Sequence, residues 1–493
     1  MCTAAALAGL GVRIWLVAGR LGVIDSDEAI PALMGKWLLR GDVRIFHWGQ
    51  DYGGGLIALP FAISEAIFGT NRAALGIVML LLDAVAAVLV WRIGTRFLTA
   101  TQAAFAAFAF WLWPALFVWF GTRPQSFYVV TLVLGLCVVV CAQRAVEERT
   151  GYRDWSLAGL CAGLGWWESP NIMYFVVPTL AWLLLRDNGR RVRELVPRAL
   201  VAIPWATAGA APWIIFNLIH DFASFPHQPE LNEGGYLDHL HYFFVYGLPT
   251  ALGLRTPFIG DWVIDTGHSV LYGAVLVVLV LALVLAIRAG WSWPALALLA
   301  YPFLFALVPF GSKLAFGRFI GNGRYLFFLA PILPLVLATV ARRVGVIALL
   351  ATGMLASSVY GFVKLDEQAD TIGGAYPTEP LIARLDRLGV DSVYASHWVA
   401  YRLTFETDER IIAIPDDFGI PYPPYLRHVK QSAKPAWVYV AGTPDADRWI
   451  ELNDAAGIPM RKVRTGHYDI VIPTSKRLPP PLLPKDDQST QPL

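Results

Sequence analysis

The sequence has few charged residues for its length. Of its 493 residues, 15% are Asp, Glu, Lys or Arg, whereas 56% are hydrophobic, and the mean hydropathy is +0.52. Because soluble globular proteins contain about 25% charged residues, this composition argues against that class and predicts a polytopic membrane protein. The net charge of +2 and the lack of basic runs give no basis for a nucleic-acid partner.

The sequence is also poor in cysteine. Its four cysteines lie in or beside apolar segments, so we expect neither a disulfide nor a metal site from Cys2, Cys137, Cys141 and Cys161. The first apolar segment, 4–22, lacks a charged start and an obvious cleavage site, which argues against a cleaved signal peptide. No internal repeat, phosphate-cradling glycine motif or G-x-S-x-G elbow is found.

Long apolar segments dominate the chain instead. A helix that crosses a hydrocarbon core of about 30 Å needs roughly 20 apolar residues, and fewer suffice inside a bundle. Two apolar segments, 31–40 and 54–68, are interrupted by proline and charged residues and predict helices that lie in the membrane interface. We predict about eleven spans, at 4–22, 72–91, 103–120, 125–143, 155–168, 171–186, 199–219, 269–288, 292–310, 324–341 and 344–362.

Arginines collect in alternate loops between these segments. Because short cytoplasmic loops carry the excess of Lys and Arg, a single orientation satisfies every cluster, with the N-terminus inside the cell. The same rule favours two short spans over one long helix at 155–186. We therefore expect a multi-pass plasma-membrane protein whose chemistry lies on the outer side, in residues 23–71 and the loops 121–124, 169–170, 220–268 and 311–323.

The composition changes after a predicted membrane domain, 1–363. Residues 364–478 predict a small extracytoplasmic α/β domain, because helical and strand patterns alternate there. Helices are expected at 379–388, 398–405 and 445–456, and strands at 391–395, 410–414, 437–441 and 467–472. Residues 479–493, rich in Pro, Gln, Ser and Thr, are expected to be disordered.

An acidic, aromatic and glycine-rich stretch, 25–55, follows the first span. Asp25, Asp27 and Glu28 begin it on the predicted outer side. A carboxylate held against the membrane face is partly desolvated, which raises its pKa toward that of a useful general base. The plainer interpretation is that these acids end a span and stay solvated.

The second half of this stretch returns polar and aromatic groups to the same surface. They suit a sugar ring, or else anchor an ordinary interface loop: His47, Gln50, Asp51 and Tyr52. The glycines at 53–55 allow a ligand or another helix to approach the backbone closely. Glu168, in the turn between two predicted spans, is a further candidate for substrate contact.

Cations gather in one predicted outer loop, where positive charge is expected to be scarce. Lys313, Arg318 and Arg324 lie there, followed by Tyr325 as a candidate substrate contact. A phosphate at the membrane face would account for them, and snorkelling beside lipid headgroups is the alternative. Arg123, in another outer loop, is a further candidate phosphate ligand.

Histidines and acids of the long outer loop do not predict a metal site. His239 and His241 beside Asp238 match no strong ligand spacing. We therefore predict no cofactor and no metal ligand, and a divalent metal stays an open alternative.

Taken together, these motifs resemble a known family. The first outer loop of bacterial GT-C fold glycosyltransferases resembles three stretches of this chain: Asp25-Ser26-Asp27-Glu28-Ala29, Leu38-Leu39-Arg40-Gly41 and Trp48-Gly49-Gln50-Asp51-Tyr52-Gly53-Gly54. These membrane enzymes are similar to protein O-mannosyltransferases and to aminoarabinose, arabinosyl and mannosyl transferases. The actinobacterial branch resembles two later stretches, Gly323-Arg324-Tyr325 with its prolines at 331 and 334, and residues 400–405.

The resemblance implies an enzyme that moves a sugar, with inversion, from a polyprenyl-phosphate donor to an envelope acceptor (a glycan, glycolipid or protein) outside the membrane. In the family, an acid of the first outer loop is the general base. Asp27 holds the matching position, with Glu28 as its neighbour and Asp25 as the fallback. The chain departs from the family where Leu56-Ile57 replaces an expected Glu, and at Lys36.

Two other functional classes stay open from the sequence. A transporter or flippase of lipid-linked sugars would place ionisable residues near the membrane centre, whereas the predicted spans hold few charges, Arg13 and Asp83 being the clearest. A non-catalytic cell-wall scaffold would leave the Asp27 region without a role. The glycosyltransferase is therefore the leading hypothesis.

Overall fold

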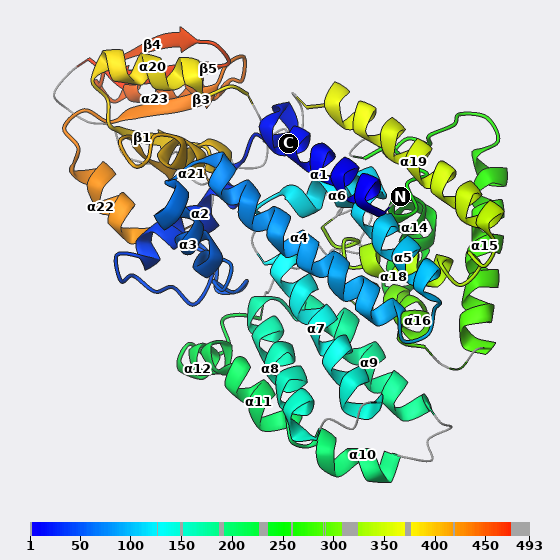
Figure 1. Ribbon diagram of the computed structural model, residues 1–493. Helices are drawn as coiled ribbons and strands as arrows, with labels where there is room; N and C mark the ends of the chain where they lie inside the picture. Colours follow the sequence, from blue (N-terminus) through cyan, green and yellow to red (C-terminus); the bar gives the residue numbers. More distant parts are fainter. Residues whose placement is uncertain are drawn as a thin grey trace.

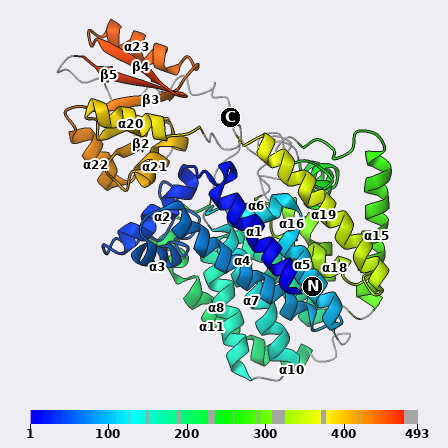
Figure 2. The ribbon, with the colours of Figure 1, turned by 45° about the horizontal axis from the view of Figure 1, so that its top comes forward.

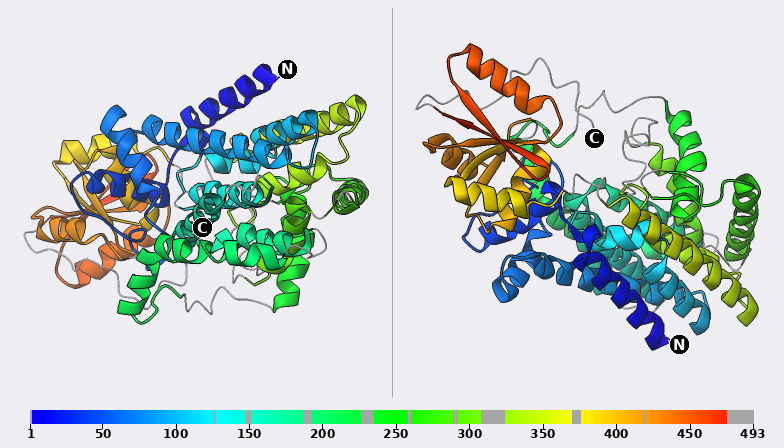
Figure 3. Two further views of the ribbon diagram at one scale, coloured as in Figure 1. Left: turned by 60° about the horizontal axis from the view of Figure 1, so that its bottom comes forward. Right: turned by 90° about the horizontal axis from the view of Figure 1, so that it is seen from above.

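The structure, a computed structural model, is mostly helical. It describes residues 2–125, 127–147, 151–186, 192–225, 235–257, 260–288, 290, 292–307, 324–369, 376–417 and 420–474. Figure 1 shows the helices gathered in one body with a C-terminal α/β domain at one end, and α2 (Ser26–Leu38) and α3 (Ala58–Phe68) beside that domain. The turned views of Figure 2 and Figure 3 keep this arrangement.

The helical body contains helices of membrane length. Among the described residues, four are long and apolar enough to cross a membrane: α4 (Arg72–Gly94), α7 (Tyr128–Glu147), α15 (His268–Arg288) and α19 (Val344–Glu367). Two bent pairs bring this to six if each pair is one span. These are α5 (Ala100–Leu112) with α6 (Ala115–Thr122), bent by 69°, and Val196–Gly209 with α12 (Ala211–Ile219), bent by 58°. The predicted number of eleven spans stays a prediction.

Shorter helices complete the body. The predicted break within 155–186 is found, because α8 (Tyr152–Glu168) and α9 (Met173–Leu185) are separate helices. The others are α1 (Cys2–Ala18), α10 (Val192–Ala199), α11 (Ala202–Gly209), α13 (Tyr236–Tyr242), α14 (Leu248–Ala251), α16 (Trp293–Phe305) and α18 (Leu329–Leu337).

The helix α2 begins five residues earlier than the predicted interfacial helix at 31–40. Asp25 is its N-cap: the side chain accepts a hydrogen bond from the Glu28 N–H, and the Glu28 side chain accepts one from the Asp25 N–H. This reciprocal capping box satisfies two backbone donors that a helix start otherwise leaves unpaired. The acidic residues are therefore the first turn of a helix rather than a loop.

The C-terminal elements form one five-stranded sheet with the order β2-β1-β3-β5-β4. The strands β1 and β2 and the strands β1 and β3 pair in parallel, whereas β5 runs antiparallel to β3 and β4. The strands are β1 (Ser392–Ala395), β2 (Ile412–Pro415), β3 (Ala436–Val440), β4 (Met460–Thr465) and β5 (Tyr468–Pro473). The helices are α20 (Glu379–Leu388), α21 (His397–Glu406), α22 (Pro423–Gln431) and α23 (Asp445–Ala455).

The sequence patterns predicted β1, β2, β3 and β5 and the helices α20, α21 and α23 within a few residues, but missed β4 and α22. The missed strand has the sequence Met-Arg-Lys-Val-Arg-Thr, with charged residues on both faces and half of its positions exposed, so it lacks an apolar face that would mark it. The domain boundaries stay predictions, and residues 479–493 lie outside the described residues.

One ion pair lies buried inside the helical body. The Arg13 guanidinium donates to the Asp83 carboxylate at 2.6 and 2.9 Å and to the Trp111 carbonyl at 2.7 Å. Its carbon lies 3.6 Å from the centre of the Trp111 ring. These two charges of the predicted spans therefore neutralise each other between α1 and α4.

Removing one partner of this pair should destabilise the protein. Asp83→Leu leaves the Arg13 charge buried without its counter-ion, and breaking such a pair costs about 3–5 kcal/mol. We expect the thermal midpoint of the purified protein to fall clearly. The double variant Arg13→Met/Asp83→Leu should recover most of the loss, and equal midpoints for the single variant and the wild type would contradict this account.

Candidate active site

The side chains of Asp25 and Glu28 are occupied by the start of α2. Asp25 is 6% exposed and accepts from the Glu28 N–H at 3.1 Å. Glu28 is fully buried and pairs with the Arg123 guanidinium through both carboxylate oxygens. Neither carboxylate faces open space, so both hold the helix in place rather than face a ligand.

Arg123 is equally committed. Besides Glu28, it donates to the carbonyls of Leu21 at 2.8 Å and Val23 at 2.7 Å, and its side chain is 6% exposed. A guanidinium carries five N–H donors, and the four hydrogen bonds to Glu28, Leu21 and Val23 leave at most one of them for a phosphate. The geometry therefore does not support the predicted phosphate role of Arg123, which instead attaches α2 to the end of α6.

Asp27 is the most exposed of the three acids in this first turn. Its side chain is 23% exposed, and its Oδ1 lies 3.0 Å from Nε2 of His397. His397 comes from the first turn of α21, directly after β1, and the two residues are 370 positions apart in the chain. The sequence analysis missed His397, because no local pattern connects the strand that precedes it with the first outer loop.

The electrostatics of Asp27 differ from the expectation. Burial raises the pKa of Asp27, but the hydrogen bond and charge of His397, with smaller effects of His47 and Arg324, lower it to about 2. The prediction of a raised pKa is therefore wrong for Asp27, where countercharges outweigh desolvation, whereas burial does raise the pKa of Asp25 and Glu28. Burial lowers the pKa of His397, but its hydrogen bond to Asp27 gives a net rise.

His47 lies beneath the same helix start. Its ring is buried, with Nε2 3.3 Å from the Asp27 carbonyl oxygen and Nδ1 3.2 Å from the Trp48 carbonyl oxygen. Burial lowers its pKa, so the imidazole is neutral near pH 7. His47 therefore supports the backbone at Asp27 instead of presenting both ring nitrogens to a ligand.

The neighbouring turn holds three more predicted contacts, of which Tyr52 lies close enough to Asp27 for the charge of Asp27 to affect the pKa of its hydroxyl. The Oε1 of Gln50 is buried and has no hydrogen-bond partner among the described residues. Asp51 accepts a hydrogen bond from the Ser224 hydroxyl through its backbone carbonyl, and its side chain is exposed. Tyr52 is 38% exposed, and its pKa is raised by burial and by the charges of Tyr128 and Asp27.

Glu168 holds this turn from the end of α8. Its backbone carbonyl accepts from the Gly54 N–H at 2.9 Å, and its Oε2 accepts from the Leu56 N–H at 3.1 Å. A Cβ at Gly54 would lie 2.5 Å from that oxygen. The close approach that glycine permits at this position is therefore to α8, and Glu168 positions the turn and the start of α3.

Arg324 is the predicted phosphate-binding cation that the structure places near Asp27. Its charge lowers the pKa of both Asp25 and Asp27, and it hydrogen-bonds with Tyr128. Tyr325 follows it, and its carbonyl accepts from the Tyr301 hydroxyl at 2.6 Å. Lys313 and Arg318 lie outside the described residues.

The C-terminal domain docks directly on α2. The Ser26 hydroxyl accepts hydrogen bonds from the N–H groups of Tyr401 at 3.0 Å and Arg402 at 3.3 Å. Lys36, which departs from the family pattern, pairs with Glu409 at 2.8 Å. These contacts hold the C-terminal domain against α2, and this position places His397 beside Asp27.

Aromatic packing extends this contact from the first outer loop. The rings of Trp48 and Tyr422 stack with centres 3.8 Å apart and planes at 4°. Trp37 donates through Nε1 to Glu409 at 2.8 Å and lies edge-on to Tyr422. The turn around Trp48 was predicted to face a sugar, but its indole packs against the C-terminal domain.

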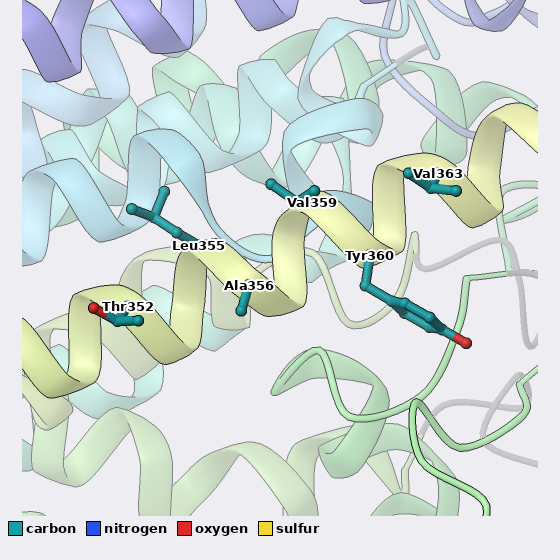
Figure 4. A pocket seen from close by; sticks show the side chains of 6 residues that line it. All are labelled: Thr352, Leu355, Ala356, Val359, Tyr360 and Val363. Carbon is teal, nitrogen blue, oxygen red and sulfur yellow. The ribbon is translucent and has the colours of Figure 1, made fainter.

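Other features of the helical body lie away from this chemistry. A groove of about 620 Å³ lies along α19. Figure 4 shows the six side chains that line it: Thr352, Leu355, Ala356, Val359, Tyr360 and Val363. It is apolar and carries no acid or base. Within the described ranges, no group of three or more His, Cys, Asp and Glu side chains is placed to hold a metal ion.

Comparison with known proteins identifies the fold. Residues 56–216 match the model of the dolichyl-phosphate-mannose-protein mannosyltransferase family. The crystal structure of ArnT from Cupriavidus metallidurans bound to undecaprenyl phosphate is similar over 97% of this chain and 100% of its own, with a TM-score of 0.60 and 11% identity. The oligosaccharyltransferase of Archaeoglobus fulgidus, in complex with zinc and sulfate, covers 88% of this chain and 67% of its own, with a TM-score of 0.52 and 13% identity.

No curated protein sequence matches the chain. The family model and the two structures nevertheless agree with the resemblance found in the sequence, which is confirmed for the GT-C fold. The closer resemblance to the actinobacterial branch stays a prediction.

The ion pair between Asp27 and His397 should make stability depend on pH. The lowered pKa of Asp27 contributes stability above its unfolded value of 3.8, and this is lost as the pH falls through about 2. The raised pKa of His397 contributes stability below its unfolded value of 6.5, which is lost as the pH rises through the folded value. His397→Gln should therefore destabilise most between about pH 4 and 6.5, by roughly 1–2 kcal/mol.

Thermal midpoints of wild type and His397→Gln across pH 3 to 9 check this expectation. A difference that does not shrink above neutral pH would show that His397 stabilises by packing alone.

Proposed function

From the GT-C fold of this chain we infer an integral-membrane glycosyltransferase that moves a sugar from a polyprenyl-phosphate donor to a cell-envelope acceptor. The observation that carries this proposal is the placement of Asp27, partly exposed at the start of α2 with Arg324 close enough to affect its pKa. A base and a cation in one place are what transfer from a phosphate to a hydroxyl requires.

Asp27 is proposed to accept the proton of the acceptor hydroxyl. The oxygen then attacks the anomeric carbon, and the bond to the donor phosphate breaks through an oxocarbenium-like state. A single displacement of this kind inverts the anomeric configuration. Arg324, with Lys313 and Arg318 as further predicted ligands, would compensate the charge on the leaving phosphate.

The proposed donor class is supported by the fold relative whose structure contains undecaprenyl phosphate. The sugar is proposed to be a hexose or a pentose, and the acceptor a glycan, a glycolipid or a protein. Gln50, Asp51, Tyr52 and Tyr325 are proposed to contact these substrates. The charges of Asp27 and Arg324 affect the pKa of Tyr52, the charge of Arg324 affects that of Tyr325, and Gln50 and Asp51 precede Tyr52 in the same turn.

The proposed side of the membrane is the outer face of the plasma membrane, in keeping with the distribution of Lys and Arg between the loops. The alternative of a transporter or flippase has less support. The Arg13 and Asp83 charges inside the body pair with each other, and so do not line a polar pathway.

Replacing the proposed base should abolish transfer without unfolding the protein. Asp27→Asn keeps the shape but removes the proton acceptor, and general-base help is worth about 10²–10⁴-fold. We expect a loss of this size in transfer from a panel of polyprenyl-phosphate sugars, with donor binding retained. Asp454→Asn, an exposed carboxylate on α23, is the matched control, and full turnover by Asp27→Asn would place the base elsewhere.

Removing the proposed phosphate ligand should weaken donor binding. Arg324→Ala eliminates a charged hydrogen-bonding partner, and we expect donor affinity to fall about 10-fold or more, as contacts to charged groups contribute about 1.5–3 kcal/mol. Acceptor affinity should change less. Arg342→Ala, exposed in the loop before α19, is the control, and an unchanged donor affinity for Arg324→Ala would remove this role.

A further inference from the structure

His397 is a buried titratable group that the proposed mechanism does not yet use. It lies 3.0 Å from the proposed base, and its side chain is 11% exposed. Its backbone N–H donates to Asp417 at 2.8 Å, and the next turn of its helix is held by the Ser26 hydroxyl. The imidazole therefore meets Asp27 from a rigid position on a different domain.

We propose that His397 is a positioning residue that holds the reaction's proton: Asp27 takes it from the acceptor hydroxyl, and Nε2 of His397 receives it from Asp27. This inference rests on the proposed function, since it concerns the same reaction. It gives the C-terminal domain a part in the chemistry through one side chain.

The proton and electron balance is complete without a further reactant. The acceptor O–H bond breaks, its electron pair forms the new bond to the anomeric carbon, and its proton moves through Asp27 to Nε2 of neutral His397, whose own proton is then on Nδ1. The bond from the anomeric carbon to the phosphate oxygen breaks with its electrons on the phosphate. His397 then loses the proton to water before the next turnover.

The reason for such a carrier is that Asp27 is a weak base while His397 beside it is protonated, because the hydrogen bond and charge of His397 lower the pKa of Asp27. A carboxylate paired with an imidazolium has little affinity for a second proton, so the productive state has His397 neutral. The groups that act on the pair are Asp25 from the N-cap, Asp417 from the loop after β2, His47 and Arg324. Two of these, Asp25 and Asp417, are acids that favour the protonated imidazole, so they raise the pKa of His397.

The pH dependence of kcat/KM tests the proposal. If Asp27 acted alone, the acidic limb of the profile would lie in the pH range where a carboxylate titrates, whereas the pair gives a limb at or above pH 6.5, where His397 loses its proton. In His397→Gln we expect the limb to move at least 2 pH units lower and the rate at pH 8 to fall about 10–100-fold. His428→Gln, an exposed histidine on α22, should leave both unchanged.

Two results would overturn the proposal. One is a limb in the His397→Gln variant at the same pH as in wild type, whatever its rate, because a merely structural role lowers the rate without moving the limb. The other is a wild-type limb below pH 5, which decides the matter even if His397→Gln does not fold.

The activity of Asp27→Asn, measured beside these pH profiles, separates this proposal from the proposed function. If Asp27→Asn still transfers sugar at full rate, the assignment of the base fails, and the relay fails with it. If Asp27→Asn is inactive while either overturning result appears, the glycosyltransferase proposal stands and only the role of His397 is rejected.

Discussion

The fully buried ion pair between Arg123 and Glu28 is the contact on which the site depends. It joins the end of α6 to the first turn of α2, and the same guanidinium holds the carbonyls of Leu21 and Val23. Because buried charges are tolerated only when paired and hydrogen-bonded, this arrangement allows α2 little freedom. Asp27, one residue before Glu28, is thereby held at the edge of the helical body.

The first outer loop is packed from two sides. From the helical body, Glu168 binds the backbone at Gly54 and Leu56, and from the C-terminal domain, Tyr422 stacks on Trp48. The residues that the sequence predicts as ligand contacts therefore divide into two groups. Glu28, His47 and Glu168 support the backbone, whereas Asp27, Tyr52 and Arg324 lie together at its open side.

Asp27 illustrates why the surroundings of a carboxylate cannot be judged from its position near a membrane. Desolvation alone would raise its pKa, as the sequence led us to expect. A histidine from another domain supplies the countercharge that reverses the shift. A base of this kind is ionised at every physiological pH, and its reactivity depends on the protonation of its partner.

The sequence by itself determined the membrane class, the position of most helices, four of the five strands and the GT-C resemblance. Hydropathy, charge bias and short motifs are local properties, and they act through solvation of the segment that carries them. The same local reasoning singled out the acidic turn of Asp25, Asp27 and Glu28, and the family resemblance then selected Asp27 among the three.

The tertiary structure alone decided which side chains meet. Three contacts join residues that lie 95 or more positions apart in the chain. Arg123 pairs with Glu28, Glu168 binds the glycine turn, and His397 binds Asp27. Such pairs depend on how helices and domains dock, which is set by packing of many surfaces at once and leaves no periodic trace in the chain. The strand β4, whose sequence lacks an apolar face, likewise forms only because β5 is there to pair with it.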